Sequence, residues 1–326
     1  MGMQAIYFCI AFIITAVIGK IIIPILSRLK VGQNERLDGP RTHLRKQGTP
    51  TMGGIMIIIT IVILGLAYCF MNSSVAILPL LLTSAGFGLV GFVDDFKKLV
   101  LKNTEGLNPK LKMFGLLIIS TIYTVYLVRI ANIGTGILIP FTNIWFELPE
   151  WLYIIFTIVV MLGATNAVNL TDGVDGLSSS VLAIITGTLS IIAFKMENIE
   201  ASIFASIVSG ACAGFLIYNV YKAKVFMGDT GSLLLGGVIS SIAIYIKNPL
   251  ILLIIAIVPV IETISVILQV LYFRKTGKRL FRMAPLHHHF ELSGWRENKV
   301  VAVFSCITLI ACAVRNVRYL NTKGKI

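Results

Sequence analysis

Aspartates stand at the ends of long apolar segments in this chain, where charged side chains are rare. Asp94 and Asp95 follow one apolar run in GFVDDFKKL, and Asp229 precedes another in FMGDTGSLLLG. Charges at the edge of hydrocarbon are costly, so they tend to face a polar cavity that serves transport or chemistry. Mg²⁺ prefers one or two carboxylates together with waters and phosphate oxygens. The pattern therefore predicts a site for metal and phosphate, with Asp229 as the Mg²⁺ ligand.

Asp94 and Asp95 are neighbours in the chain, and successive residues of a helix point about 100° apart. We therefore expect the two carboxylates to share a target only if the helix frays; otherwise one binds and the other orients. The alternative is a solvated helix end beside Lys97 and Lys98. An unbroken pair directly after an apolar run favours a functional role.

A second cluster lies in NAVNLTDGVDGLSS. Its glycines favour a tight turn, which would gather donors and acceptors suited to a sugar, a base or a hydrated metal: Asn166, Asn169, Asp172 and Asp175. Turn chemistry with a cap for the next helix explains Gly176 and Ser178. It does not explain two asparagines at the end of a hydrophobic span.

Three adjacent histidines, His287, His288 and His289, lie in MAPLHHHFEL beside arginine-rich sequence. Consecutive residues seldom converge on one ion and no cysteine is near, so a zinc site is disfavoured. Hydrogen bonding to a pyrophosphate or a sugar fits better. Upstream, Pro259 should kink its helix, and Glu262 is either a buried hydrogen-bonded acid or part of the wall of a lipid groove.

The elements that position these residues are membrane helices. The chain is 56% hydrophobic and 13% charged, with a mean hydropathy of +0.89 over 326 residues, so we expect one integral-membrane domain over 1–326 with no soluble domain. Its all-α polytopic fold should have ten transmembrane helices, at 6–26, 52–71, 75–93, 113–130, 151–168, 178–194, 201–220, 232–246, 250–273 and 300–314.

A net charge of +13 would suit nucleic acid, but the basic residues are confined to alternate loops, so orientation explains them better and we expect no nucleic-acid partner. The basic loops, within 27–51, 97–112, 222–224 and 274–299, should be cytoplasmic. Both termini are then extracytoplasmic, and every acidic cluster and histidine faces the cytoplasm. A basic tail after the last span disagrees with this topology. A cation-coupled transporter would instead carry midplane acids on broken helices in two related halves, and no such repeat is visible.

Four segments, GFVDDFKK, NAVNLTDGVDGLSS, NVYKAKVFMGDTGSL and MAPLHHHFELSGW, together resemble the polyprenyl-phosphate N-acetylhexosamine-1-phosphate transferases. The resemblance covers nearly the whole chain, keeps the motif order, and includes RTHLRKQGTPTMGG before the second span. It implies ten transmembrane helices with both termini outside. The histidine loop is typical of the branch that acts on muramoyl-pentapeptide; the sister enzymes that use UDP-GlcNAc carry a different loop and are the nearest alternative.

The resemblance implies an Mg²⁺-dependent enzyme of the bacterial plasma membrane, with a cytoplasmic active site and a homodimeric assembly. It would move phospho-MurNAc-pentapeptide from UDP-MurNAc-pentapeptide to the membrane lipid undecaprenyl phosphate, releasing UMP and forming lipid I. Two anionic substrates must then meet at the membrane surface, so lysines and Mg²⁺ must offset their repulsion.

By the same resemblance, Asp229 binds Mg²⁺, Asp94 is the candidate base, and Asp95 supports it. Phe226 would stack on uracil. Lys98 and Lys112 would contact phosphate, and His287 and His288 the diphosphate or its metal, with His289 in the same loop. The further positions around nucleotide and sugar are Lys46, Thr51, Asn169, Asp172, Asp175 and Asn219. An aspartate acting as base or as covalent nucleophile stays open; we favour one-step displacement, because a phosphate monoester with a second pKa of about 6 needs little help from a base.

Overall fold

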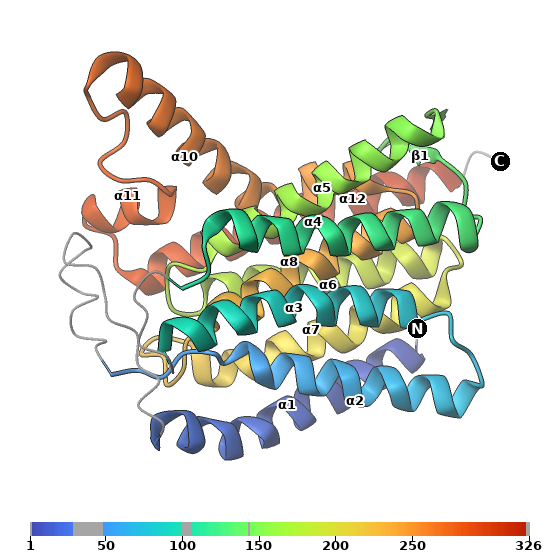
Figure 1. Cartoon of the computed structure of the whole chain (residues 1–326), viewed down its shortest axis with the longest axis horizontal. Coiled ribbons are helices and arrows are strands. Elements are labelled where there is room, and N and C mark those ends of the chain that lie inside the picture. Colours follow the sequence, from blue (N-terminus) through green and yellow to red (C-terminus); the bar gives the residue numbers. More distant parts are fainter. Residues whose placement is uncertain (1, 29–47, 100–105, 143, 324–326) are drawn as a thin grey trace.

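Long apolar runs with few charges form the helices of the computed structural model, which describes residues 2–28, 48–99, 106–142 and 144–323. Most helices lie roughly along one direction (Figure 1). The elements are α1 (Gly2–Arg28), α2 (Gly54–Asn72), α3 (Leu78–Leu99), α4 (Pro109–Val125) with a wider last turn η2 (Tyr126–Ile130), β1 (Gly136–Leu138), β2 (Trp145–Glu147), α5 (Glu150–Thr171), α6 (Leu177–Lys195), α7 (Ile199–Asn219), α8 (Gly228–Tyr245), the 3₁₀ turn η3 (Pro249–Ile251), α9 (Leu252–Ile255), α10 (Ile257–Thr276), α11 (Leu286–Leu292) and α12 (Glu297–Lys323).

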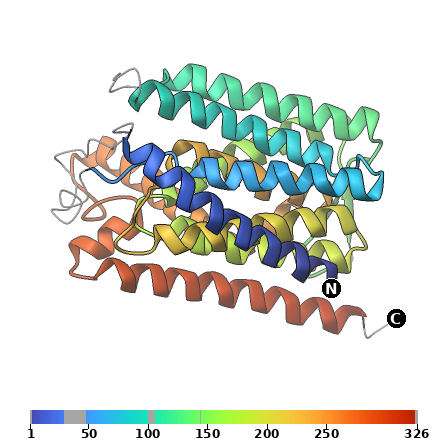
Figure 2. The same ribbon diagram turned by 90° about the horizontal axis from the view of Figure 1, so that it is seen from below.

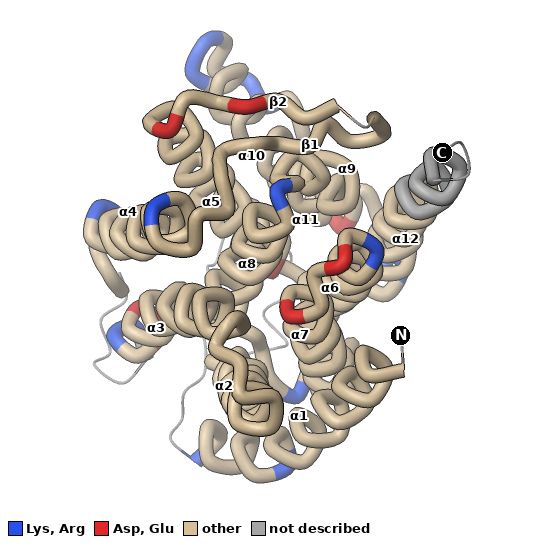
Figure 3. The backbone as a smooth tube through the Cα atoms, turned by 90° about the vertical axis from the view of Figure 1, so that its right-hand side faces the viewer, with Lys and Arg blue, Asp and Glu red and all other residues tan. Residues whose placement is uncertain are grey.

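Helix α8 forms the centre of the bundle. Every residue from Thr230 to Ile244 is buried, and the end-on view shows the other helices arranged around α8 (Figure 3). Helices α3 and α5 pack along it, while α7 lies between α1 and α6. The core is therefore built on a helix whose first turn carries Asp229.

Glycines allow the neighbouring helices to come close to that first turn. A Cβ added at Gly91 of α3 would collide with the carbonyl oxygen of Asp229, and one added at Gly54 of α2 would collide with the backbone of Gly231. Glycine is the residue that permits such an approach between backbones. The ends of α2 and α3 are thus held directly against the start of α8.

Nine helices in the described part of the chain are long and apolar enough to cross a membrane. They correspond to nine of the ten predicted spans. The remaining predicted span, 232–246, is α8, which is a helix of 18 residues, as expected. The protein is therefore a mostly helical, multi-pass membrane protein.

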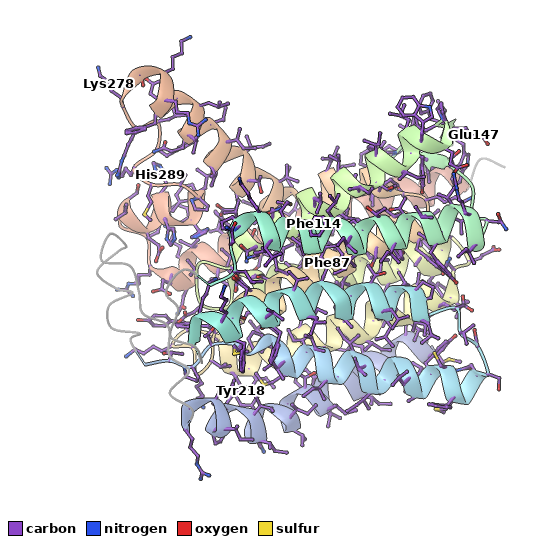
Figure 4. All side chains as sticks on the ribbon, viewed as in Figure 1. Phe87, Phe114, Glu147, Tyr218, Lys278 and His289 are labelled. Carbon is purple, nitrogen blue, oxygen red and sulfur yellow. The ribbon has the colours of Figure 1, made fainter. Side chains whose placement is uncertain are left out.

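The chain enters and leaves the bundle at the same end. The N and C labels lie at the end opposite α11 in two perpendicular views (Figures 1 and 2). We call this end, opposite α11, the far end. There β1 and β2 form a short antiparallel hairpin with Ile137 opposite Phe146. We call the other end, which carries α11, the site end. Figure 4 shows Lys278 and His289 there and Glu147 at the far end.

The span predicted at 250–273 is interrupted. Helix α9 ends at Ile255, Ala256 leaves the helical conformation (φ −99°, ψ 33°), and α10 begins at Ile257. Proline lacks an N–H and its ring crowds the carbonyl four residues earlier, which here belongs to Ile255. The kink predicted for Pro259 is confirmed as a break one turn before it. Beyond the break α10 runs obliquely away from the bundle (Figure 1).

Candidate active site

Asp95 caps the first turn of α8. Its carboxylate accepts hydrogen bonds from the backbone N–H of Asp229 (3.2 Å), from that of Thr230 (2.8 Å) and from the Thr230 hydroxyl (2.6 Å). The first N–H groups of a helix have no partner inside it, and their partial positive charge favours an anion. Asp95 thus joins α3 to α8 and fixes where Asp229 stands.

Asp94 faces a different set of partners. Its Oδ2 lies 2.6 Å from Lys98 Nζ, one turn along α3, and its Oδ1 accepts from the backbone N–H of Leu107 at 2.7 Å. The residue before Leu107 is Gly106, whose φ of +68° favours glycine. A Cβ at Gly106 would lie 2.5 Å from Lys98 Cε, so only glycine allows the backbone this close to Lys98. Only 2% of Asp94 is exposed.

The expectation that these two carboxylates converge only if the helix frays is wrong. Helix α3 continues to Leu99, yet each of Asp94, Asp95 and Asp229 offers an oxygen within 4.8 Å of the others. The two side chains have different partners: Asp95 accepts from the backbone of α8, and Asp94 contacts the lysines that hold Asp229. The expected division of labour, in which one aspartate orients, fits Asp95.

Asp229 gathers side chains from three other helices. Its Oδ2 lies 3.0 Å from Lys98 Nζ of α3 and 2.9 Å from Lys112 Nζ of α4. Its Oδ1 accepts from Asn169 Nδ2 of α5 at 2.8 Å, and the same amide reaches the Ser232 hydroxyl at 2.8 Å. At 17% side-chain exposure, Asp229 is more open than Asp94. The predicted site residues Asp94, Asp95, Lys98, Lys112, Asn169 and Asp229 therefore form one cluster, the carboxylate–lysine cluster.

The carboxylate–lysine cluster has the chemistry of a divalent-cation site. Its donors are carboxylate oxygens, which Mg²⁺ prefers. Counted with every group ionised, three carboxylates and two ammonium groups have a formal charge of −1. Asp94 and Asp95 are only 2% and 4% exposed. Asp229, the more exposed carboxylate, is the member that best fits a metal ligand.

The segment after α5 is a tight turn, as its glycines predicted, with Gly176 at φ +81°. Two predicted binding residues hold this turn to the chain beyond α7. Asp175 accepts from the Ala223 N–H at 3.0 Å. The side-chain oxygen of Asn219 accepts from the Gly176 N–H (3.1 Å), and its amide donates to the Val225 carbonyl (3.0 Å). Asp175 and Asn219 are buried and shape the site through these bonds.

Asp172 stands in the same turn and is half-buried. Burial, and then the negative charges of Asp229, Asp95 and Asp175, raise its pKa to about 8. Its carboxyl group is therefore mainly protonated at neutral pH and can donate a hydrogen bond.

Asn166, also predicted to bind substrate, has a bond within its own helix: its side-chain amide donates to the Leu162 carbonyl at 2.7 Å.

Phe226 and Thr51 lie where two segments pair before entering their helices. The Phe226 N–H donates to the Pro50 carbonyl (2.8 Å), and the Gly53 N–H donates to the Phe226 carbonyl (2.8 Å). Phe226 is half-buried and Thr51 is buried. A Cβ at Gly228 would lie 2.9 Å from Thr51 Oγ1 and 2.6 Å from Asp95 Oδ2, so Thr51 adjoins the α8 cap. Lys46 lies outside the described residues.

The three histidines have separate neighbours. His287 is buried, and its Nε2 packs so closely on Gly173 that a Cβ there would collide with it. His288 Nδ1 lies 2.7 Å from Glu291 Oε2. His289 Nδ1 accepts from the Arg282 N–H at 3.2 Å, which leaves the ring proton on Nε2. Among them, the contact with Gly173 brings His287 to the turn that bears Asp172.

Comparison with known proteins agrees with this site. Residues 77–247 match the model of glycosyl transferase family 4, and residues 46–58 match phospho-N-acetylmuramoyl-pentapeptide-transferase signature 1. The phospho-N-acetylmuramoyl-pentapeptide-transferase of Acetivibrio thermocellus is 47% identical over 307 residues, 94% of this chain and 92% of the relative. That of Bacillus subtilis is 48% identical over 306 residues, 92% and 94% of the two chains. The chain belongs to the phospho-N-acetylmuramoyl-pentapeptide-transferases.

Membership of the phospho-N-acetylmuramoyl-pentapeptide-transferases makes this chain a transferase and gives no support to the transporter alternative. The glycosyl transferase range contains the whole carboxylate–lysine cluster and Phe226, and the signature contains Lys46 and Thr51. The histidines lie beyond both ranges, so their place in the site rests on the contact between His287 and Gly173.

Sequence reasoning missed two features of this transferase site. The first is that Asp95, a residue of another helix, caps α8. Glu262, left open between a hydrogen-bonded acid and a lipid groove, accepts from the His287 N–H at 3.2 Å. Both are contacts between elements far apart in the chain, and no local pattern signals them.

Proposed function

We propose that this protein transfers phospho-MurNAc-pentapeptide from UDP-MurNAc-pentapeptide to undecaprenyl phosphate, giving lipid I and UMP. The observation that carries the proposal is the cluster around Asp229, where carboxylates and lysines of α3, α4 and α8 meet. The chain that bears this cluster is 47% and 48% identical to two phospho-N-acetylmuramoyl-pentapeptide-transferases. A lipid phosphate oxygen attacks the β-phosphorus, a new P–O bond forms, and the bond to the bridging oxygen breaks with its electron pair leaving on UMP.

Lys98 and Lys112 are proposed to bind the reacting phosphates. Both ammonium groups form ion pairs with Asp229, and the two lysine side chains remain partly exposed, at 37% for Lys98 and 20% for Lys112. Fixed cations aimed at phosphate oxygens stabilise charge that shifts during displacement. Two anionic substrates would add to a cluster that already carries excess negative charge, so a further cation is needed.

That cation is proposed to be Mg²⁺, held by Asp229 together with waters and phosphate oxygens. When bound, it would supply Lewis-acid stabilisation of the transferred phosphoryl group. Asp95 keeps Asp229 in position through the α8 cap. Asp94 is the candidate base, although its oxygens already accept bonds from Lys98 and Leu107. The lipid phosphate has a second pKa of about 6 and is largely ionised at neutral pH, so direct displacement needs little proton transfer.

The nucleotide and sugar are proposed to lie along the edge of the cluster. The Phe226 ring would stack on uracil, since aromatic rings bind bases by stacking. Protonated Asp172 would donate to a sugar or phosphate oxygen. Thr51, Asn169 and Lys46 would form further polar contacts with the nucleotide and the sugar. His287 and His288, with His289 beside them, would contact the diphosphate from α11.

We propose that all ten long helices, α8 included, cross the plasma membrane of the bacterium with the site end in the cytoplasm. The described loops and helix ends at the site end carry Lys97, Lys110, Lys222, Lys224, Arg274, Lys275, Arg279 and Arg296. Basic loops remain on the cytoplasmic side. The nucleotide substrate would reach the site from there, and both termini would lie outside. A homodimer is part of this proposal.

The test is release of UMP by detergent-purified protein. We expect UMP only when UDP-MurNAc-pentapeptide, undecaprenyl phosphate and Mg²⁺ are all present, and none with EDTA. UMP without lipid would instead indicate a covalent intermediate or hydrolysis. Turnover of UDP-GlcNAc in place of the pentapeptide substrate would replace this function with that of the sister enzymes.

A further inference from the structure

Helices α10 and α11 meet at a buried pair of side chains, Glu262 and His287. Each side chain is 1% exposed. Glu262 Oε1 accepts from the His287 backbone N–H at 3.2 Å and lies 3.2 Å from Nδ1 of the same imidazole. One carboxylate oxygen therefore contacts both the backbone and the ring of His287.

Among the described residues, Glu262 Oε2 and His287 Nε2 have no hydrogen-bond partner, and Nδ1 lies beside Glu262 Oε1 without forming an aligned hydrogen bond. Burying polar groups without partners is unfavourable. Packing alone does not explain the pair, because apolar side chains of similar size would fill the space at lower cost. Unpaired buried atoms next to a candidate site indicate groups kept for a ligand.

The imidazole is enclosed on its other sides. Nε2 packs on Gly173 in the turn after α5, and the His288 ring lies with its centroid 4.1 Å away. Gly173 directly follows Asp172 in the chain. The contact with Glu262 on one edge and with Gly173 on the other fixes the direction of the ring.

We infer that Glu262 is a positioning residue: it holds the α11 backbone at His287 by a hydrogen bond and places a carboxylate 3.2 Å from Nδ1, so that Nε2 is directed at the turn bearing Asp172. A carboxylate beside one ring nitrogen sets the tautomer and leaves the other nitrogen for a ligand. The inference deepens the proposed function and rests on it, since the ligand in question is the substrate diphosphate.

The first measurement is independent of catalysis. The chain has four histidines, His43, His287, His288 and His289, so ¹⁵N spectra of histidine-labelled, full-length protein can be assigned with His287→Asn. We expect His287 to carry its proton on Nδ1 in the wild type and to lose that signature in Glu262→Leu, which has no acceptor. If the Leu variant does not fold, Glu262→Gln must still shift the His287 signals, because a neutral amide is a weaker acceptor. Unchanged signals in a folded variant would overturn the inference.

The second measurement is UMP release with both substrates. We expect kcat to fall about ten-fold in Glu262→Leu, with Glu262→Gln between this and the wild type, because one misdirected hydrogen bond at a reacting group has about this effect. Glu150→Gln at the far end, where Glu150 pairs with Arg129 on the surface, is the matched control and should keep wild-type turnover. Wild-type kcat in Glu262→Leu would overturn the positioning role. Absence of UMP in the wild type with intact ¹⁵N signatures would instead overturn the proposed function.

Discussion

Asp95 of α3 and Thr230 of α8 are joined by two hydrogen bonds to one carboxylate oxygen, 2.8 Å from the Thr230 N–H and 2.6 Å from its hydroxyl. Asp229 precedes Thr230 in the chain. A side chain from a second helix thus caps the helix that carries the candidate metal ligand. Catalytic geometry and helix packing depend on the same carboxylate.

Replacing Asp95 with Ala should therefore lower both stability and turnover. Loss of a helix cap costs about 1 kcal/mol, and here it also frees Asp229 to move. Asp95→Asn keeps a side-chain oxygen as acceptor and should retain more of the melting temperature. Thermal unfolding in detergent and UMP release check both effects. An Asp95→Ala protein with wild-type values of both would show that the cap does not hold the site.

Lys112 and Lys110 offer a matched pair on α4. Lys112 contacts Asp229, whereas Lys110 is exposed and has no side-chain contact with the carboxylate–lysine cluster. Lys112→Ala should reduce kcat/KM roughly 10²-fold, as expected for one fixed donor at a phosphoryl group. Lys110→Ala should stay within about two-fold of the wild type, since exposed charges contribute little. Equal losses in the two variants would show a general effect of loop charge instead.

Gly91 should not tolerate a side chain. A methyl group there would collide with the Asp229 carbonyl oxygen, so Gly91→Ala must displace α3 from the start of α8 and should abolish most turnover. Gly163 of α5 is the control, because a Cβ there meets nothing within 4 Å. Gly163→Ala should be active and slightly more stable, since alanine favours helix by about 1 kcal/mol over glycine. Full activity in Gly91→Ala would contradict the tight contact between the helices.

The raised pKa of Asp172 predicts that the stability of the protein depends on pH. Its pKa of about 8 in the folded protein lies above the usual value of about 3.9, so the folded state binds the proton more tightly than the unfolded chain. This contribution to stability is full below pH 4 and is lost as the pH rises through 8. The melting temperature of the wild type should therefore fall relative to that of Asp172→Asn between pH 5 and 8. Parallel curves would show an ordinary exposed carboxyl.

Much of this architecture is visible in the sequence. Apolar runs bounded by turns located the long helices, and the glycines after Asn169 located the turn that carries Asp172. The break at Ala256 follows from Pro259. These are local signals, in which a segment and its neighbours determine the outcome.

The site itself depended on contacts between helices. The angle between successive helical residues gave no sign that Asp94 and Asp95 each bring an oxygen within 4.8 Å of one from Asp229, because this depends on how α8 packs against α3. Asp175 and Asn219 were predicted to bind the substrate, and nothing in the sequence indicated the bonds by which they also tie two loops together. The burial that moves the pKa of Asp172 and the pairing of Glu262 with His287 likewise arise only when distant segments pack.

The central claim is that Asp229 and its lysines transfer a phospho-sugar to a lipid. The most direct measurement is mass spectrometry of the lipid product after incubating protein with UDP-MurNAc-pentapeptide, undecaprenyl phosphate and Mg²⁺, comparing wild type with Asp229→Asn. The account predicts undecaprenyl-diphospho-MurNAc-pentapeptide from the wild type and none from Asp229→Asn, because a neutral amide is a poor Mg²⁺ ligand. Equal product from a folded Asp229→Asn protein would contradict it.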